Sequence, residues 1–171
     1  MLALATSHCS LFLAADTGYA HAFAQAPERS AVPLNAYVGI GAGGKHGAAG
    51  GGWSLRTKWS DNVQQFSLAP FYYVLVGAEE NEDGSPPVAA FLLGGFDIFT
   101  VESVAGVGAG SIGSPFVQLG AFFHVHRLLG LTASVSFEDD IRFNAVPSTG
   151  YVSFLLGVGA VRFNAPVHVW H

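Results

Sequence analysis

The chain has 171 residues, of which only 11% are charged, while 50% are hydrophobic and 22 are glycine. The net charge of −5 argues against nucleic-acid binding, which needs a basic surface, and the single cysteine, Cys9, excludes an internal disulfide. No apolar run reaches the roughly 18 residues of a transmembrane helix. A soluble domain would need more charged residues on its surface than this chain has.

The N-terminal segment, residues 1–30, differs in composition from the rest. It is rich in alanine, contains the apolar stretch Leu11–Ala15, and carries Ala24-Gln25-Ala26 directly before Pro27. An apolar stretch followed by small residues is typical of a secretory leader, although the usual positive start is missing. We interpret residues 1–30 as a secretory leader or a disordered extension.

Residues 31–163 alternate between apolar and small or polar residues in short segments, and this period of two is typical of strands. We predict an all-β fold, a closed antiparallel up-and-down transmembrane β-barrel of about eight strands, followed by a C-terminal tail at 164–171. The predicted strands are Leu34–Gly43, Gly51–Trp59, Gln65–Ala78, Val88–Phe99, Ser103–Gly110, Phe116–His126, Leu131–Phe137 and Tyr151–Phe163.

The hairpin from Val117 to Phe137 shows which face meets which surroundings. One face is apolar and the other carries small hydroxyls, glycines and histidines with almost no charge, a poor surface for water. This pattern favours a wall with an apolar outside and a polar inside, as in a membrane-spanning barrel. The predicted outer face comprises Val117, Leu119, Ala121, Phe123, Val125, Leu131, Ala133, Val135 and Phe137; the predicted inner face comprises Gln118, Gly120, His124, His126, Thr132, Ser134 and Ser136.

The predicted connections fall into two sets. Short ones follow the second, fourth and sixth strands, and the two long acidic ones, Glu79–Pro86 and Glu138–Gly150, follow the third and seventh. Because alternate connections of an up-and-down barrel lie at the same end, we expect both acidic loops at one rim.

At the segment Leu155–Phe163, the chain resembles the small eight-stranded outer-membrane β-barrel proteins of Gram-negative bacteria, whose closing strand ends on an aromatic residue. The resemblance implies a secreted precursor, insertion into the bacterial outer membrane, and short turns on the periplasmic side. Two features depart from the pattern: Phe163 is out of phase with Val158, which a bulge would absorb, and eight residues follow it.

Three groups of residues could carry chemistry. Gly39–His46 matches most of a phosphate-binding loop, but His46 replaces the magnesium-binding hydroxyl and the glycines that follow disfavour a helix, so we interpret it as a hairpin loop. His124 and His126 could chelate a metal with Asp97 or Glu102, yet we expect two lumen histidines. Glu138, Asp139 and Asp140 could form an acid–base cluster, but we expect a solvated loop.

We therefore predict no catalytic, cofactor-binding or metal-binding residues and no cofactor. The expected function is that of a non-catalytic outer-membrane barrel, a monomer in the lipid bilayer, with a structural, adhesive or narrow-lumen role. Its small-molecule ligand stays open. Two alternatives are an outer-membrane enzyme with a rim site and a soluble lipocalin-like barrel that binds an apolar ligand. Lipid A deacylases carry a His-x-Ser pair on one strand, and we expect no such pair in this chain.

Overall fold

The computed structural model describes residues 8–23, 30–44, 46–60, 63–77, 86–104, 107–111, 114–126, 129–140 and 149–165. Within these ranges all regular structure is β-strand, and no helix is long and apolar enough to cross a membrane. The strands are β1 (His8–Phe23), β2 (Ser30–Gly44), β3 (Gly47–Trp59), β4 (Val63–Gly77), β5 (Val88–Asp97), β6 (Phe99–Val104), β7 (Val107–Ser111), β8 (Ser114–His126), β9 (Leu129–Asp140) and β10 (Thr149–Ala165).

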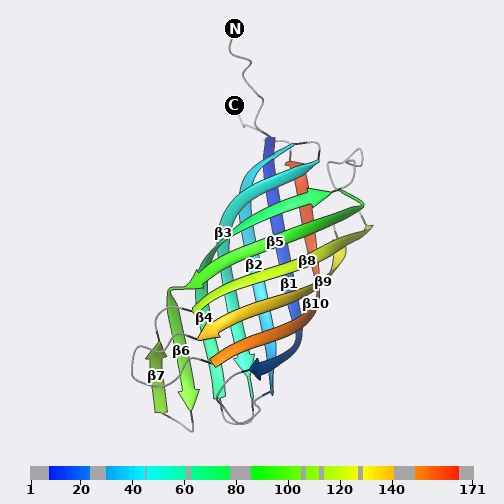
Figure 1. The fold of residues 1–171 in the computed structure, drawn as a ribbon. Helices are drawn as coiled ribbons and strands as arrows, with labels where there is room; N and C mark the ends of the chain where they lie inside the picture. The colour runs from blue at the N-terminus through cyan, green and yellow to red at the C-terminus, as the bar shows by residue number, and fades with distance from the viewer. Residues whose placement is uncertain are drawn as a thin grey trace.

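Eight of these strands close into an antiparallel barrel, in the circular order β1, β2, β3, β4, β5, β8, β9, β10. Each strand pairs with its neighbour along the chain, and β10 returns to pair with β1. The start of β1 and the end of β10, which are the termini of the described chain, lie at the same end, and β6 and β7 extend from the opposite end (Figure 1). The predicted closed up-and-down barrel is confirmed.

The strands β5 to β8 form one long hairpin rather than three strands of the wall. Asp97 pairs with Ser114 and Thr100 pairs with Ser111, so the β6–β7 ladder continues the register of the β5–β8 ladder. Along β4, the partner changes from β5 to β6 next to Pro70, whose nitrogen has no hydrogen to donate to a ladder. The prediction that Ser103–Gly110 is one barrel strand is therefore wrong, because this segment turns back on itself beyond the wall.

This hairpin also corrects the expected placement of the loops. Three wall strands, β5, β8 and β9, lie between the two acidic connections, one fewer than predicted. The connection from β4 to β5 therefore lies at the end of the termini, and the connection from β9 to β10 lies at the end of β6 and β7. The two acidic connections are therefore at opposite rims, contrary to the prediction that they share one.

The barrel still has eight wall strands, because β1 takes the place of the predicted strand Ser103–Gly110. It lies within the segment interpreted from the sequence as a leader or a disordered extension. Its residues pair with β2 on one side and β10 on the other, so the barrel begins at His8 and not at residue 31. Asp16, which interrupts the apolar stretch, is 3% exposed and points into the lumen. At the other boundary, β10 continues past Phe163 to Ala165, and residues 166–171 lie outside the described part.

The surface has the predicted inside-out pattern. Val117 and Leu119 on β8 are 49% and 60% exposed, whereas Gln118 between them is 1% exposed. The same alternation holds on β3, where Trp53 and Leu55 point outward while the side chains of the polar residues between and beyond them are buried. An apolar outer surface around a polar and aromatic interior is suited to a bilayer, and it is the reverse of a soluble lipocalin-like barrel.

Phe163 keeps the alternation of β10 rather than breaking it. The β9–β10 ladder has no shift, and Phe163 is fully buried inside the barrel. Against β1 the register shifts here, because Leu11 pairs with Arg162 and Cys9 with Ala165, which leaves one extra residue of β10 next to Phe163. The closing aromatic residue therefore fills the lumen instead of facing lipid.

Candidate functional site

The lumen is the region that gathers most polar side chains, and it divides into two halves. We call the half nearest the termini the aromatic half; its rings pack edge-on or stacked, with Phe12 at 5.5 Å from Tyr73 and 5.9 Å from Phe91 between ring centroids. The aromatic half comprises Phe12, Tyr37, Phe71, Tyr73, Phe91, Phe122 and Phe163, all nearly inaccessible.

Glycine makes this packing possible on β2. A Cβ atom at Gly39 would lie 2.8 Å from Cε1 of Tyr73 and 3.2 Å from Cζ of Phe71, closer than van der Waals contact allows. The segment that resembles a phosphate-binding loop is therefore wall: β2 continues to Gly44, which pairs with Gly47 on β3. The hairpin interpretation of Gly39–His46 is confirmed, although its loop is much shorter than expected.

A set of amides and a carboxylate separates the two halves. The Tyr37 hydroxyl donates to Oε1 of Gln118 at 2.7 Å, and Gln118 Nε2 donates to Oδ2 of Asp16 and to Oγ of Ser134, both at 2.8 Å. Asn35 Nδ2 donates to the other Asp16 oxygen, also at 2.8 Å. Because both carboxylate oxygens accept hydrogen bonds, the buried charge of Asp16 is solvated by the protein.

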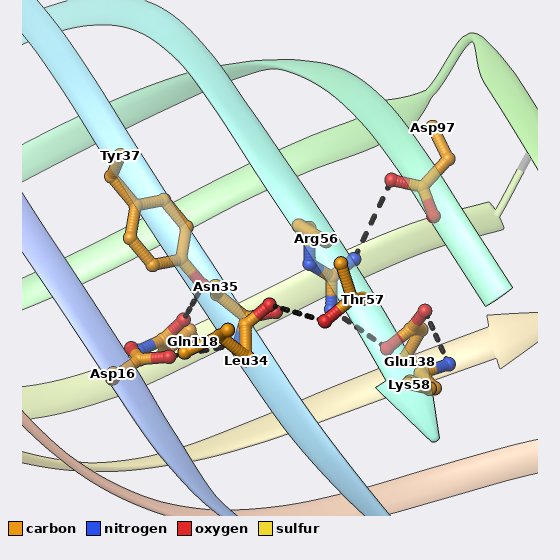
Figure 2. Close-up of polar contacts among 10 residues, drawn as sticks. All are labelled: Asp16, Leu34, Asn35, Tyr37, Arg56, Thr57, Lys58, Asp97, Gln118 and Glu138. Carbon is orange, nitrogen blue, oxygen red and sulfur yellow. Dashed lines mark hydrogen bonds and ion pairs between the residues drawn. The ribbon is translucent and has the colours of Figure 1, made fainter. Parts of the chain in front are cut away.

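The second half holds an ion cluster formed by Arg56, Lys58, Asp97 and Glu138 (Figure 2). Arg56 Nη2 donates to Oε2 of Glu138 at 2.7 Å, while Lys58 Nζ lies 2.5 Å from the other oxygen. Arg56 Nη1 is 3.6 Å from Oδ1 of Asp97. All four side chains are at most 9% exposed, so each charge depends on the others for its compensation.

Aromatic rings complete the surroundings of both cations. The Arg56 guanidinium carbon lies 3.9 Å from the centroid of Phe116, and Lys58 Nζ lies 4.2 Å from that of Tyr151. A cation over a ring face gains energy from the ring quadrupole, most of all where water is excluded. The ion cluster is thus held by carboxylates on one side and by ring faces on the other.

Three contacts join strands that lie opposite each other in the barrel, four positions apart in its circular order. Arg56 on β3 meets Glu138 on β9, Tyr37 on β2 meets Gln118 on β8, and Phe12 on β1 meets Phe91 on β5. Side chains from opposite walls can touch only where nothing else fills the space between them. These cross-lumen contacts fill the interior of the barrel in both halves.

The structure separates the histidines from their proposed partners. The register against β9 shifts between His124 and His126, at the end of β8 nearest the termini. Asp97 is paired with Ser114 at the other end of β8, and Glu102 lies further along on β6. Within the described part of the chain, no group of three metal-binding side chains occurs. The suggested third ligands, Asp97 and Glu102, are therefore wrong.

The acidic run at the end of β9 is also divided. Glu138 points inward to the ion cluster, and Asp139 is exposed on the other face. Successive strand residues point to opposite sides, so adjacent carboxylates on a strand do not share a site. The side chain of Asp140 lies outside the described set. The expected solvated loop is therefore wrong for Glu138, and residues 141–148 lie outside the described part of the chain.

The prediction that the chain has no His-x-Ser pair is wrong, because the triplet His8-Cys9-Ser10 occurs in β1. The Ser10 hydroxyl is 1% exposed and lies 2.7 Å from the hydroxyl of Tyr73, inside the aromatic half. A serine enclosed by rings has no access for a lipid substrate. The structure therefore places Ser10 among packed interior side chains, whereas Cys9 is exposed.

The ion cluster and the Asp16 set were not predicted as a site. The signal was present, because Arg56 and Lys58 share one face of a strand whose other face is apolar, and a charge inside a membrane barrel must find a partner. The partners could not be read from the sequence: Arg56 and Glu138 are 82 residues apart.

No protein-family model and no curated protein matches the chain. Solved structures do: Neisserial surface protein A (NspA) has a TM-score of 0.61 and 14% identity, covering 88% of this chain and 96% of that one. The outer membrane enzyme PagL has a TM-score of 0.52 and 15% identity, covering 91% and 99%. The predicted bacterial outer-membrane location agrees with these likenesses and with the apolar outer surface. The chain has the fold of the small eight-stranded outer-membrane β-barrels.

Proposed function

We propose that this chain is a non-conducting, non-catalytic outer-membrane barrel, a monomeric anchor that holds the β6–β7 extension outside the bilayer. The observation that carries the proposal is the set of cross-lumen contacts, above all Arg56 to Glu138 at 2.7 Å. An eight-stranded barrel is just wide enough for side chains to fill it, and here they do.

The termini and the extension give the barrel a direction. Outer-membrane barrels have short periplasmic turns and longer outer loops. The β2–β3 and β8–β9 turns at the end with the termini are short and only the β4–β5 connection there is long, so we assign this end to the periplasm. The β5–β8 hairpin, which continues into β6 and β7, then projects outward. A surface anchor needs a rigid wall and a projecting element, and the barrel supplies both.

Conductance tests the closed lumen. The purified barrel, reconstituted into a planar bilayer, should show no stable current steps, whereas a porin measured in parallel should show them. A variant that removes one residue of each cross-lumen contact (Phe12→Ala, Tyr37→Ala and Arg56→Ala) should conduct if it folds, as judged by heat-dependent gel mobility. Steady current steps from the unaltered protein would overturn the proposal.

Arginine placed at two depths tests the membrane arrangement. Val135 lies within β9, and Leu129, on the same outer face, lies at its beginning. We expect Val135→Arg to lower the free energy of unfolding in lipid vesicles by about 2–4 kcal/mol, and Leu129→Arg by about 0–1 kcal/mol, because the cost of a charge falls toward the interface. Urea titration measures both, and equal costs would contradict a transmembrane wall.

The exposed native thiol tests the orientation. Cys9 is exposed near the end of the barrel that carries the termini. In intact cells a membrane-impermeant maleimide should leave it unlabelled, whereas a cysteine at exposed Ser30, at the other end, should react in a Cys9→Ser background. Labelling of Cys9 but not of the Ser30 position would reverse the assignment.

A further inference from the structure

The outer surface carries a groove of about 820 Å³ across β8, β9, β10 and β1. Its walls and floor include Tyr19, Leu119, Ala133, Val135, Phe154 and Leu156, almost all apolar. These residues belong to the band that faces the bilayer, so the groove is continuous with the lipid-contacting surface.

The register explains why the wall is hollowed here. Leu119, Val135, Phe154 and Tyr19 are cross-strand partners and form one row of large side chains around the barrel. In the next row toward the termini, Ala121 is paired with Ala133, and the row after that returns to Phe123 and Leu131. Two adjacent alanines between rows of large residues leave a depression.

Exposure shows the same relief. Leu119, Phe154 and Leu156 are 60%, 61% and 69% exposed, whereas Ala133, which lies between them, is less exposed. Gly18 adds to the floor, since a Cβ atom there would collide with the carbonyl oxygen of Phe154 at 1.8 Å. The backbones of β1 and β10 therefore approach without a side chain between them.

We propose that this groove binds one acyl chain of a lipid from the surrounding bilayer. This inference rests on the proposed transmembrane arrangement. Inside a bilayer there is no water to exclude, so the hydrophobic effect does not favour the contact between the groove and an acyl chain. The acyl chain is retained by van der Waals packing alone. A flexible chain can follow the alanine-lined depression, which a flat wall of large side chains would not offer.

The position of the polar groups fits a lipid with its head toward the β6–β7 end. Tyr19 and His21 share the outer face of β1, on the side of the groove nearest that end, and both are exposed. Tyrosine prefers the level of the headgroups, because its ring is apolar and its hydroxyl is polar. The chain would then descend past Phe154 toward Ala133.

A phospholipid with a photoactivatable diazirine in its acyl chain tests this site. The full barrel is reconstituted into vesicles of phosphatidylethanolamine that contain the probe, and labelled peptides are identified by mass spectrometry. We expect peptides of β8, β9 and β10 to be labelled several-fold more than those of β3 and β4, which lie on the other side of the barrel.

Two matched alanine variants complete the design. Ala133→Phe fills the groove and should remove the excess labelling, whereas Ala49→Phe, at an exposed position on β3 directly opposite β9, should leave it unchanged. Uniform labelling, or an excess that survives Ala133→Phe, would overturn the acyl-chain site. Absence of labelling from every outer face would instead contradict the transmembrane arrangement, so the two failures are distinguishable.

Discussion

The two halves of the lumen reach the same burial by different chemistry. The aromatic half is closed by ring packing, in which each contact is weak and non-directional, and the other half is closed by four charges that depend on one another. Truncation of a buried ring lowers the stability in proportion to the packing contacts that are lost. An ion cluster fails when one member is lost, because its partners stay buried without compensation.

This difference has a consequence for the wall. The ion cluster joins β3 to β9 and the hydrogen bond of Tyr37 joins β2 to β8, each across the full width of the barrel. In the aromatic half the contact of Phe12 with Phe91 also crosses the barrel, but Phe12 contacts three further rings as well. We therefore expect single substitutions to separate the two halves.

Removal of Glu138 is one of the two changes with the largest expected effect. Glu138→Ala leaves Arg56 and Lys58 buried without their shared carboxylate, and we expect a loss of about 3–5 kcal/mol in the free energy of unfolding. Urea unfolding in vesicles measures it. Asp139→Ala, at the exposed neighbouring position, is the matched control and should change stability by no more than about 0.5 kcal/mol.

A second variant distinguishes mutual dependence from simple loss of contacts. Replacement of the whole set by apolar residues (Arg56→Met, Lys58→Met, Glu138→Leu and Asp97→Leu) should recover most of the stability, because no buried charge is then left without a partner. If this variant were as unstable as Glu138→Ala, the ion cluster would be a favourable bond rather than a set of mutually compensated charges.

Truncation of Phe12 should cost about 3–5 kcal/mol, since it is fully buried and its removal leaves a cavity among four rings. Its outward neighbour on β1, Leu13, is the control. Leu13→Ala should cost less, because lipid chains can occupy the space that the side chain leaves. A Phe12 variant with nearly normal stability in the same unfolding titration would mean that the aromatic half is loosely packed.

The sequence predicted the wall of the barrel because the period-two alternation is local. The pattern is clearest on β3 and β9, where large residues point outward and small or polar ones inward, whereas β4 turns the rings of Phe71 and Tyr73 inward. The assignment failed for β1, where Leu11–Ala15 is apolar on both faces and so matches a leader as well as a strand. Asp16, which interrupts this apolar stretch, is a lumen residue of the strand.

The contacts across the lumen could not be predicted in the same way. Which residues meet from opposite walls depends on the order of the strands around the barrel and on their stagger, and the order was altered by the interpretation of Ser103–Gly110 as wall and of residues 1–30 as leader. Glu138 illustrates this: the sequence placed it in a solvated acidic run, and only the register places it against Arg56.

The fit of the glycine on β2 can be tested by a single methyl group. Gly39→Ala brings a Cβ atom to 2.8 Å from Tyr73 in the aromatic half, and we expect a loss of about 1–3 kcal/mol from overpacking. Gly44→Ala, on the same strand, meets no atom within 4 Å and should leave the urea midpoint almost unchanged. Equal effects would show that both report backbone freedom and not ring packing.

The smallest effect should come from the hydrogen bond at the boundary between the two halves. Tyr37→Phe keeps the ring in the aromatic half and removes the hydroxyl that donates to Gln118, so we expect a loss of about 1 kcal/mol in the free energy of unfolding. Because Gln118 also holds Asp16, the variant should be non-additive with Gln118→Ala in a double-mutant cycle, measured by the same urea titration. It should be additive with Glu138→Ala if the ion cluster acts as a separate unit. Strong coupling between Tyr37→Phe and Glu138→Ala would instead make the Asp16 set and the ion cluster one network, and the division of the polar residues drawn here would fail.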